Sequence, residues 1–181
     1  MNYHIIYKMN CDGKYAQIFN NQEMTGKDEQ FMRRAIALAQ TGMEANAGGP
    51  FGAIVVKDGE IIGEGWNRVT STNDPTAHAE IIAIREACKK IDSFQLDGCT
   101  IYTSCEPCPM CLGAIYWARP AQVFYACTRE DAARIEFDDQ FIYDELEKPF
   151  EERHLKIVNF MRDEALQVFG KWAEKPDKIE Y

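Results

Sequence analysis

The sequence predicts an α/β domain with three layers, helix–sheet–helix, followed by a helical C-terminal segment. Three observations support this fold class. Apolar residues recur at helical spacing in the segment after residue 27 and again over residues 77–91. Short apolar runs of strand length lie between these segments, and the dipeptide Asp58-Gly59 is typical of a hairpin turn. With 181 residues, the chain is long enough for one domain with a real core.

The first predicted helix runs from Asp28 to about Ala45, and Thr25 with Asp28 resembles a capping box at its start. The glycines and proline at residues 48–50 end it. Further along the chain, helices and strands alternate. The expected strands are Phe51–Lys57, Glu60–Val69, Cys99–Ser104 and Ala121–Cys127, and the expected helices are Ala77–Ile91 and Pro109–Ala118. Residues 130–181 are expected to form helical segments broken at Lys148-Pro149 and Pro176.

Two of these helix starts contain possible metal ligands. His78 lies at the start of one helix, and Cys108 and Cys111 lie at the start of another. One nitrogen and two thiolates form the ligand set of a catalytic zinc site with an open fourth position. Pro109 suits the first turn of a helix with Cys108 at the cap, so the two cysteines would share one helical face. The positive end of the helix dipole favours their thiolate forms.

Glu80 lies two residues beyond His78, about 200° round a helix, so it is better placed beside a metal-bound water than on the metal. Each half of this pattern has simpler readings. His-x-Glu alone is common at a helix start, and Cys-x-x-Cys also occurs in redox and structural-metal sites. A closed structural zinc site would need a fourth protein ligand, for which Cys105 and Cys99 are candidates. Cys105 is expected in the strand or turn before the helix, which favours the three-ligand catalytic site.

The charge distribution bears on the class of substrate. The net charge is −9, and residues 130–181 contribute −7 of it. This acidic half argues against a broad phosphate-binding surface, although it leaves room for a local groove. The sequence has no apolar run of membrane length and no secretory leader, and its cysteine count is an odd seven. We therefore expect reduced thiols, a cytoplasmic protein and no membrane partner.

The motif His-x-Glu followed by Pro-Cys-x-x-Cys is the signature of zinc nucleobase deaminases. From about Lys27 onward the chain resembles the cytidine-deaminase-like zinc deaminases, and among them the bacterial guanine deaminases. The segments that resemble this family are GGPFGAIVVKDG (48–59), NDPTAHAE (73–80), YTSCEPCPMCLGAIYWARP (102–120), FDDQFIY (137–143) and the terminal Tyr181. The resemblance implies a five-stranded mixed sheet and hydrolytic deamination of guanine to xanthine and ammonia. It also implies a homodimer in which the C-terminal segment is exchanged and closes the partner's pocket.

The resemblance also implies a role for each matching residue. His78, Cys108 and Cys111 would bind one Zn²⁺ per chain, and Glu80 would transfer protons between water, the purine ring and the departing amine. The expected substrate-binding residues are Phe51, which would pack against the base, Asn67, which would read the purine edge, Asp139, which would accept from guanine N–H groups, and Tyr181, which would help close the pocket. From the residues alone, Asn67 is equally suited to capping a strand end, whereas a core position is favoured for Phe51 and plain solvation for Asp139.

Other functions remain open at this stage. The segments Gly65–Arg68 and Asp74–Glu80 resemble tRNA adenosine deaminases equally well, but a basic surface or tail for RNA phosphates is missing from the sequence. A guanosine deaminase, a pyrimidine-base deaminase and a zinc-stabilised interaction domain without turnover are further alternatives. Residues 1–24 depart from the family pattern, and we expect them to be an extension or an upstream start before a deaminase domain spanning 25–181.

Overall fold

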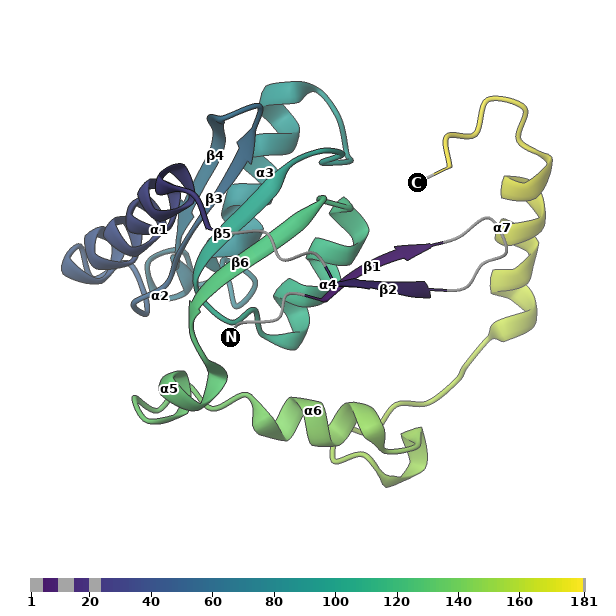
Figure 1. Cartoon of the computed structure of the whole chain (residues 1–181). Helices are drawn as coiled ribbons and strands as arrows, with labels where there is room; N and C mark the ends of the chain where they lie inside the picture. The colour runs from purple at the N-terminus through teal and green to yellow at the C-terminus, as the bar shows by residue number, and fades with distance from the viewer. Residues whose placement is uncertain (1–4, 10–14, 20–23, 181) are drawn as a thin grey trace. The chain divides into compact units, whose positions relative to one another are not determined.

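The structure is a computed structural model that describes residues 5–9, 15–19 and 24–180. The chain divides into two compact units, one up to Asp138 and the other from Asp139 onward. The first unit contains the predicted α/β domain (Figure 1).

A four-stranded mixed sheet forms the centre of the first unit. Its strands are β3 (Gly52–Lys57), β4 (Glu60–Trp66), β5 (Thr100–Cys105) and β6 (Gln122–Cys127). Their order is β4-β3-β5-β6, with β3 antiparallel to both neighbours and β5 parallel to β6. Asp58 and Gly59 both have positive φ at the β3–β4 turn, as a type I′ hairpin requires.

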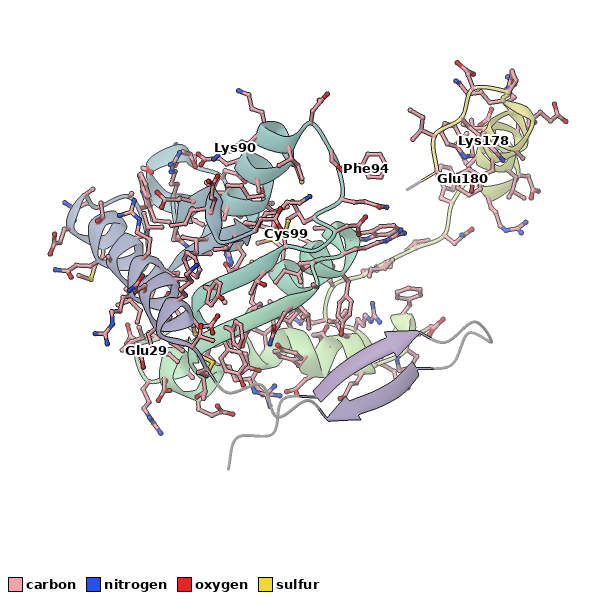
Figure 2. All side chains as sticks on the ribbon, turned by 45° about the horizontal axis from the view of Figure 1, so that its top comes forward. Glu29, Lys90, Phe94, Cys99, Lys178 and Glu180 are labelled. Atoms are coloured by element: carbon pink, nitrogen blue, oxygen red, sulfur yellow. The ribbon has the colours of Figure 1, made fainter. Side chains whose placement is uncertain are left out.

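Helices cover both faces of this sheet (Figure 1). Helix α1 (Gly26–Glu44) packs on one face, where Leu38 meets Ile54 and Tyr102. Helices α3 (Ala79–Ile91) and α4 (Pro109–Ala118) pack on the other face, around Val55 and Ile101. Cys99 is fully buried in this second core, and Figure 2 shows it inside the unit, with Lys90 pointing outward. The predicted three-layer class is confirmed.

The approach of α3 to the sheet depends on glycine. A Cβ built on Gly65 of β4 would lie 2.3 Å from the carbonyl oxygen of Ala79 and 2.8 Å from the amide nitrogen of Ala83. Only a residue without a side chain fits between β4 and the helix backbone at this point. The first turn of α3, which contains Glu80, is therefore held close to the end of β4.

Most predicted elements are confirmed to within two residues. The Thr25–Asp28 capping box is present with both of its hydrogen bonds, and α4 has the predicted bounds. The strand expected to reach Val69 was wrong at its end, because β4 stops at Trp66 and Val69–Thr72 form the short helix α2.

The family resemblance implies a sheet of five strands, whereas the sheet of the described residues has four. The residue pattern itself had indicated four. After β6, Thr128 forms a capping box with Asp131 and starts helix α5 (Arg129–Ala133), so the chain leaves the edge of the sheet.

Two further parts of the chain contain secondary structure of their own. Strands β1 (Ile5–Met9) and β2 (Tyr15–Phe19) form an antiparallel hairpin with Met9 opposite Tyr15. The C-terminal unit contains α6 (Gln140–Glu147), a short 3₁₀ helix (Phe150–Glu152) and α7 (Arg162–Glu174), which agrees with helical segments interrupted near Pro149 and Pro176. The predicted domain boundary between residues 24 and 25 stays a prediction.

Candidate metal centre and substrate site

Three possible metal ligands lie together at the ends of two helices. The ligand atoms of His78, Cys108 and Cys111 are all within 4.8 Å of one another, and no other such group of three is found in the part of the chain that the structure describes. Nδ1 of His78 lies 3.5 Å from each of the two sulfur atoms. The structure thus brings together the three residues that the sequence singles out.

The helix ends explain how these side chains are presented. His78 is the N-cap of α3 and Cys108 is the N-cap of α4, both with extended backbone, and neither side chain caps its helix. Their carbonyl oxygens accept the first helical hydrogen bonds, at 3.0 Å from the nitrogen of Ile82 and 2.8 Å from that of Leu112. Each ligand side chain therefore remains available while the backbone at its position is fixed.

The electrostatics of the cluster favour a thiolate. The hydrogen bond from Cys111, supported by that from His78, outweighs burial and lowers the pKa of the Cys108 thiol to about 4. The hydrogen bond to Cys108 raises the pKa of His78, while the bond to Cys108 together with burial raises the pKa of Cys111. Cys108 is therefore the first of the three to lose its proton, and its thiolate accepts hydrogen bonds from Cys111 and His78.

Glu80 follows in the first turn of α3 and is 6% exposed. Burial, the largest cause, raises the pKa of its carboxyl group. The hydroxyl of Thr103, on β5, donates to Oε1 of Glu80 across 3.1 Å. A buried carboxyl group whose pKa is raised, next to a possible metal site, is suited to accept and return a proton near neutral pH.

Asn67 lies just beyond β4 and is 5% exposed. Its Oδ1 accepts from the amide of Val69 at 3.1 Å, so the strand-end capping role is present. Its backbone amide donates to the carbonyl oxygen of Phe51, and Arg68 donates to that of Ala77, next to a ligand. These bonds connect the end of β4 to the start of β3 and to the start of α3.

Gly48 makes room for the Asn67 side chain. A Cβ at Gly48 would lie 2.1 Å from Oδ1 of Asn67, closer than two such atoms can approach.

Phe51 packs edge-on against Phe137, with ring centroids 5.0 Å apart and an interplanar angle of 89°. Gly49 leaves space for both rings, since a Cβ there would lie 2.7 Å from Phe137 and 2.9 Å from Phe51. Phe51 also packs against the α3-side core, as the core interpretation expects, and its contact with the base stays a prediction.

Cys105, the candidate fourth ligand, is the last residue of β5 and is outside the cluster. Its sulfur lies 3.6 Å from the carbonyl oxygen of Thr128, and burial raises the pKa of its thiol to about 12. Cys99 is buried in the core. Among the described residues, the cluster therefore contains three possible protein ligands and no fourth.

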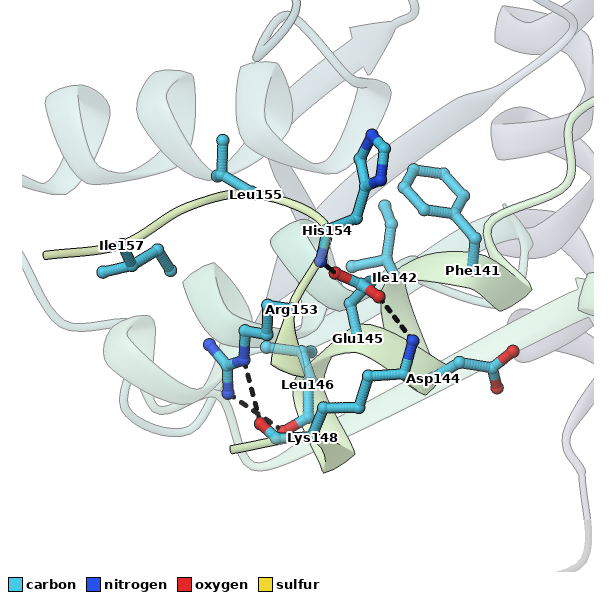
Figure 3. A pocket seen from close by; sticks show the side chains of 10 residues that line it. All are labelled: Phe141, Ile142, Asp144, Glu145, Leu146, Lys148, Arg153, His154, Leu155 and Ile157. Atoms are coloured by element: carbon cyan, nitrogen blue, oxygen red, sulfur yellow. Dashed lines mark hydrogen bonds and ion pairs between the residues drawn. The ribbon is translucent and has the colours of Figure 1, made fainter. Parts of the chain in front are cut away.

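Two of the expected substrate residues, Asp139 and Tyr181, belong to the C-terminal part of the chain. Asp139 is half-buried, begins the second unit and is the N-cap of α6. Tyr181 lies outside the described residues. The second unit has its own hollow of about 490 Å³, lined by apolar residues such as Phe141 and Leu155 and by His154 and Arg153 (Figure 3). The amide of His154 donates to Glu145 at the rim of this hollow.

The cluster fits zinc by both donor chemistry and spacing. Tetrahedral zinc with bonds of about 2.3 Å to sulfur and about 2.0–2.1 Å to nitrogen requires about 3.5 Å between these atoms. The nitrogen–sulfur distances from His78 to Cys108 and to Cys111 are both 3.5 Å. The model of the cytidine and deoxycytidylate deaminase zinc-binding region matches residues 25–127, which include all of these groups.

The chain belongs to this family.

Among its relatives, guanine deaminase from Bacillus subtilis (strain 168) is 58% identical over 153 residues, which are 84% of this chain and 98% of the relative. A tRNA-specific adenosine deaminase from Buchnera aphidicola is 38% identical over 147 residues, 81% of this chain and 93% of the relative. The X-ray structure of guanine deaminase from Bacillus subtilis superposes with a TM-score of 0.83, at 56% identity, and covers 87% of this chain and 99% of that one. In this zinc-binding deaminase family, the His/Cys/Cys cluster is the group that can hold the ion.

Three residues near the deaminase site lie in segments that carry the family resemblance but were given no individual role by the sequence: Gly48, Thr103 and Phe137. A polar residue within the apolar run of β5 was a possible signal for Thr103, but its partner on α3 emerges only from the packing.

No helix in the described part of the chain is long and apolar enough to cross a membrane. The six cysteines of that part are all free.

Proposed function

We propose that this deaminase hydrolyses guanine to xanthine and ammonia. The observation with the most weight is that a complete His/Cys/Cys cluster with a buried Glu80 occurs in a chain 58% identical to a guanine deaminase over 98% of that relative's length. The identity to the tRNA-specific adenosine deaminase is lower, 38%. The acidic charge of residues 130–181 also favours a small base over a phosphate backbone.

The proposed chemistry divides between a metal and the protein. His78, Cys108 and Cys111 would hold zinc, which would supply an activated water molecule because zinc lowers the pKa of bound water to about 7. The carboxylate of Glu80 would accept one proton from that water and pass it to the ring nitrogen beside C2 of guanine as the water oxygen bonds to C2. It would then take the remaining hydroxyl proton and give it to the amino group, so that the C2–N bond breaks and xanthine and ammonia leave. A positioned acid–base group of this kind typically contributes 10²–10⁴-fold to the rate.

Other residues would orient the base. The side chain of Asn67 is fixed by its bond to Val69, so its NH₂ group is oriented to donate to an acceptor on the purine edge. The ring of Phe51, held edge-on by Phe137, would pack against the base. By the resemblance, Asp139 would accept hydrogen bonds from the N–H groups of guanine, and Tyr181 would help to close the pocket.

The same resemblance leads us to propose a homodimer with exchanged C-terminal segments. Helices α6 and α7 contain no buried residue. Large apolar side chains along this unit are exposed, among them Phe141 at 65%, Phe160 at 82% and Phe169 at 71%. Isolated short helices with no buried face are marginal in water, so this unit needs an apolar surface to cover it. A second copy of the chain provides one.

One assay tests the proposed reaction. Purified protein reconstituted with zinc is incubated with guanine, guanosine, adenosine, cytosine and a tRNA anticodon stem-loop, and ammonia release is measured. We expect guanine to have the highest kcat/KM. A preference for the stem-loop would replace this proposal with tRNA adenosine deamination, and retention of zinc without turnover would favour an interaction domain.

The contribution of the C-terminal unit is tested by Asp139→Ala. Guanine's N–H groups would lose their carboxylate acceptor, and a hydrogen-bonding group left unpaired costs about 1–3 kcal/mol, so kcat/KM for guanine should fall by about 5- to 100-fold with zinc content unchanged. Asp163→Ala is the control, since the side chain of Asp163 is 99% exposed in the same unit. Wild-type kinetics in Asp139→Ala would remove this residue from the substrate site.

A further inference from the structure

Thr103 is a buried polar residue that has no role in the mechanism described above. It is 1% exposed and lies near the end of β5, in register with Ala53 of β3. Ala53 belongs to the core on the α3 side of the sheet, so Thr103 points toward the same helix. There its hydroxyl donates to Oε1 of Glu80 across 3.1 Å.

A hydroxyl group at this position needs a specific reason. Its strand neighbours on the same face, Ile101 and Ala53, are apolar and fully buried. Valine has nearly the same shape and would fill the site without the cost of burying a polar group. The cost is offset at Thr103 because the hydroxyl meets a carboxylate, and hydrogen bonds to charged groups are among the stronger ones.

We propose that Thr103 is a positioning residue for deamination, which holds Oε1 of Glu80 so that Oε2 exchanges the proton with water and substrate. This inference rests on the proposed function, since it assigns a role through Glu80.

The adjacent hydroxyl shows a different use of the same chemical group. Ser104 points to the opposite face of β5, as strand alternation requires. Its oxygen accepts from the backbone amide of Gly52 at 3.0 Å and so connects β5 to β3. The hydroxyl of Ser104 supports the backbone, whereas that of Thr103 contacts the proposed proton carrier.

The test uses Thr103→Val, which keeps the shape and removes the donor, and Thr103→Ser, which keeps the donor. We expect Thr103→Val to lower kcat about ten-fold, with KM for guanine and zinc content unchanged, and Thr103→Ser to keep kcat within about three-fold of wild type. Thr100→Val makes the same chemical change on the same strand, away from Glu80, and should leave all three quantities unchanged.

A double-mutant cycle separates positioning from a general structural effect. If Thr103 acts through Glu80, Thr103→Val should lower kcat no further in a Glu80→Gln background. An additive loss, a loss of zinc in Thr103→Val, or wild-type kcat in that variant would each overturn the inference. The comparison is made on whichever base the wild-type protein deaminates. Failure on guanine alone therefore counts against the proposed function and not against Thr103.

Discussion

The substitution Gly48→Ala tests whether the position of Asn67 matters for substrate recognition. A Cβ at Gly48 would lie 2.1 Å from Oδ1 of Asn67 and 2.8 Å from its carbonyl oxygen. Ordinary contacts between such atoms begin near 3.4 Å, so the amide must move by about 1 Å. That movement would disrupt the 3.1 Å hydrogen bond to Val69, which fixes the amide.

A displacement of about 1 Å in a substrate-positioning group can cost about 10²-fold, and overpacking typically costs about 1–3 kcal/mol of stability. We therefore expect Gly48→Ala to lower kcat/KM for guanine by about 10²-fold while retaining one zinc per chain. Steady-state ammonia release and metal analysis measure both quantities. Gly26→Ala is the control, since a Cβ there meets nothing within 4 Å. If Gly48→Ala keeps kcat/KM within about three-fold of wild type, the assigned role of Asn67 is refuted.

Two further predictions concern the metal and the core. Cys105→Ser should keep one zinc per chain and guanine turnover, because the Cys105 sulfur contacts Thr128 and not the cluster; metal analysis showing loss of zinc would make Cys105 the fourth ligand. Tyr102→Phe should lower the free energy of unfolding by about 1–3 kcal/mol in urea titrations, because Tyr102 donates to Asp28 at 2.5 Å. Burial acts to raise the pKa of Asp28, but the hydrogen bonds from Thr25 and Tyr102 outweigh it, so the pKa in the folded protein is lowered. The stabilisation is therefore present above the unfolded-state pKa near 3.8 and is lost as the pH falls through the lower pKa of the folded state. The difference between wild type and Tyr102→Phe should therefore shrink in acid, and a difference that grows below pH 3 would contradict this assignment.

The sequence was sufficient for features that depend on local chemistry. The Thr25–Asp28 capping box, the Asp58-Gly59 turn and the bounds of α4 follow from side-chain hydrogen bonding, positive φ and Pro109 at the first helical position. The metal cluster was also predictable, because helix starts orient their cap residues in a defined way. His78 and Cys108 both occupy N-caps, as the local pattern implies.

Features that depend on packing between distant segments could not be predicted. The contact between Thr103 and Glu80 joins a strand to a helix 23 residues away in the chain, and no local pattern specifies it. The close approach of Gly48 to Asn67 is of the same kind. Asp139 lies in the second unit, which exposes its apolar side chains. In the proposed homodimer, its role would depend on a partner surface, which no local pattern of the sequence specifies.

The central claim is that Glu80 transfers the proton during deamination at the His78, Cys108 and Cys111 site. The most direct measurement is guanine turnover by Glu80→Gln at full zinc occupancy, since glutamine keeps the shape of the side chain and removes the titratable group. The proposed mechanism predicts zinc content equal to that of wild type and a kcat at least about 10²-fold lower. A zinc-loaded Glu80→Gln protein with near-normal release of ammonia from guanine would contradict it.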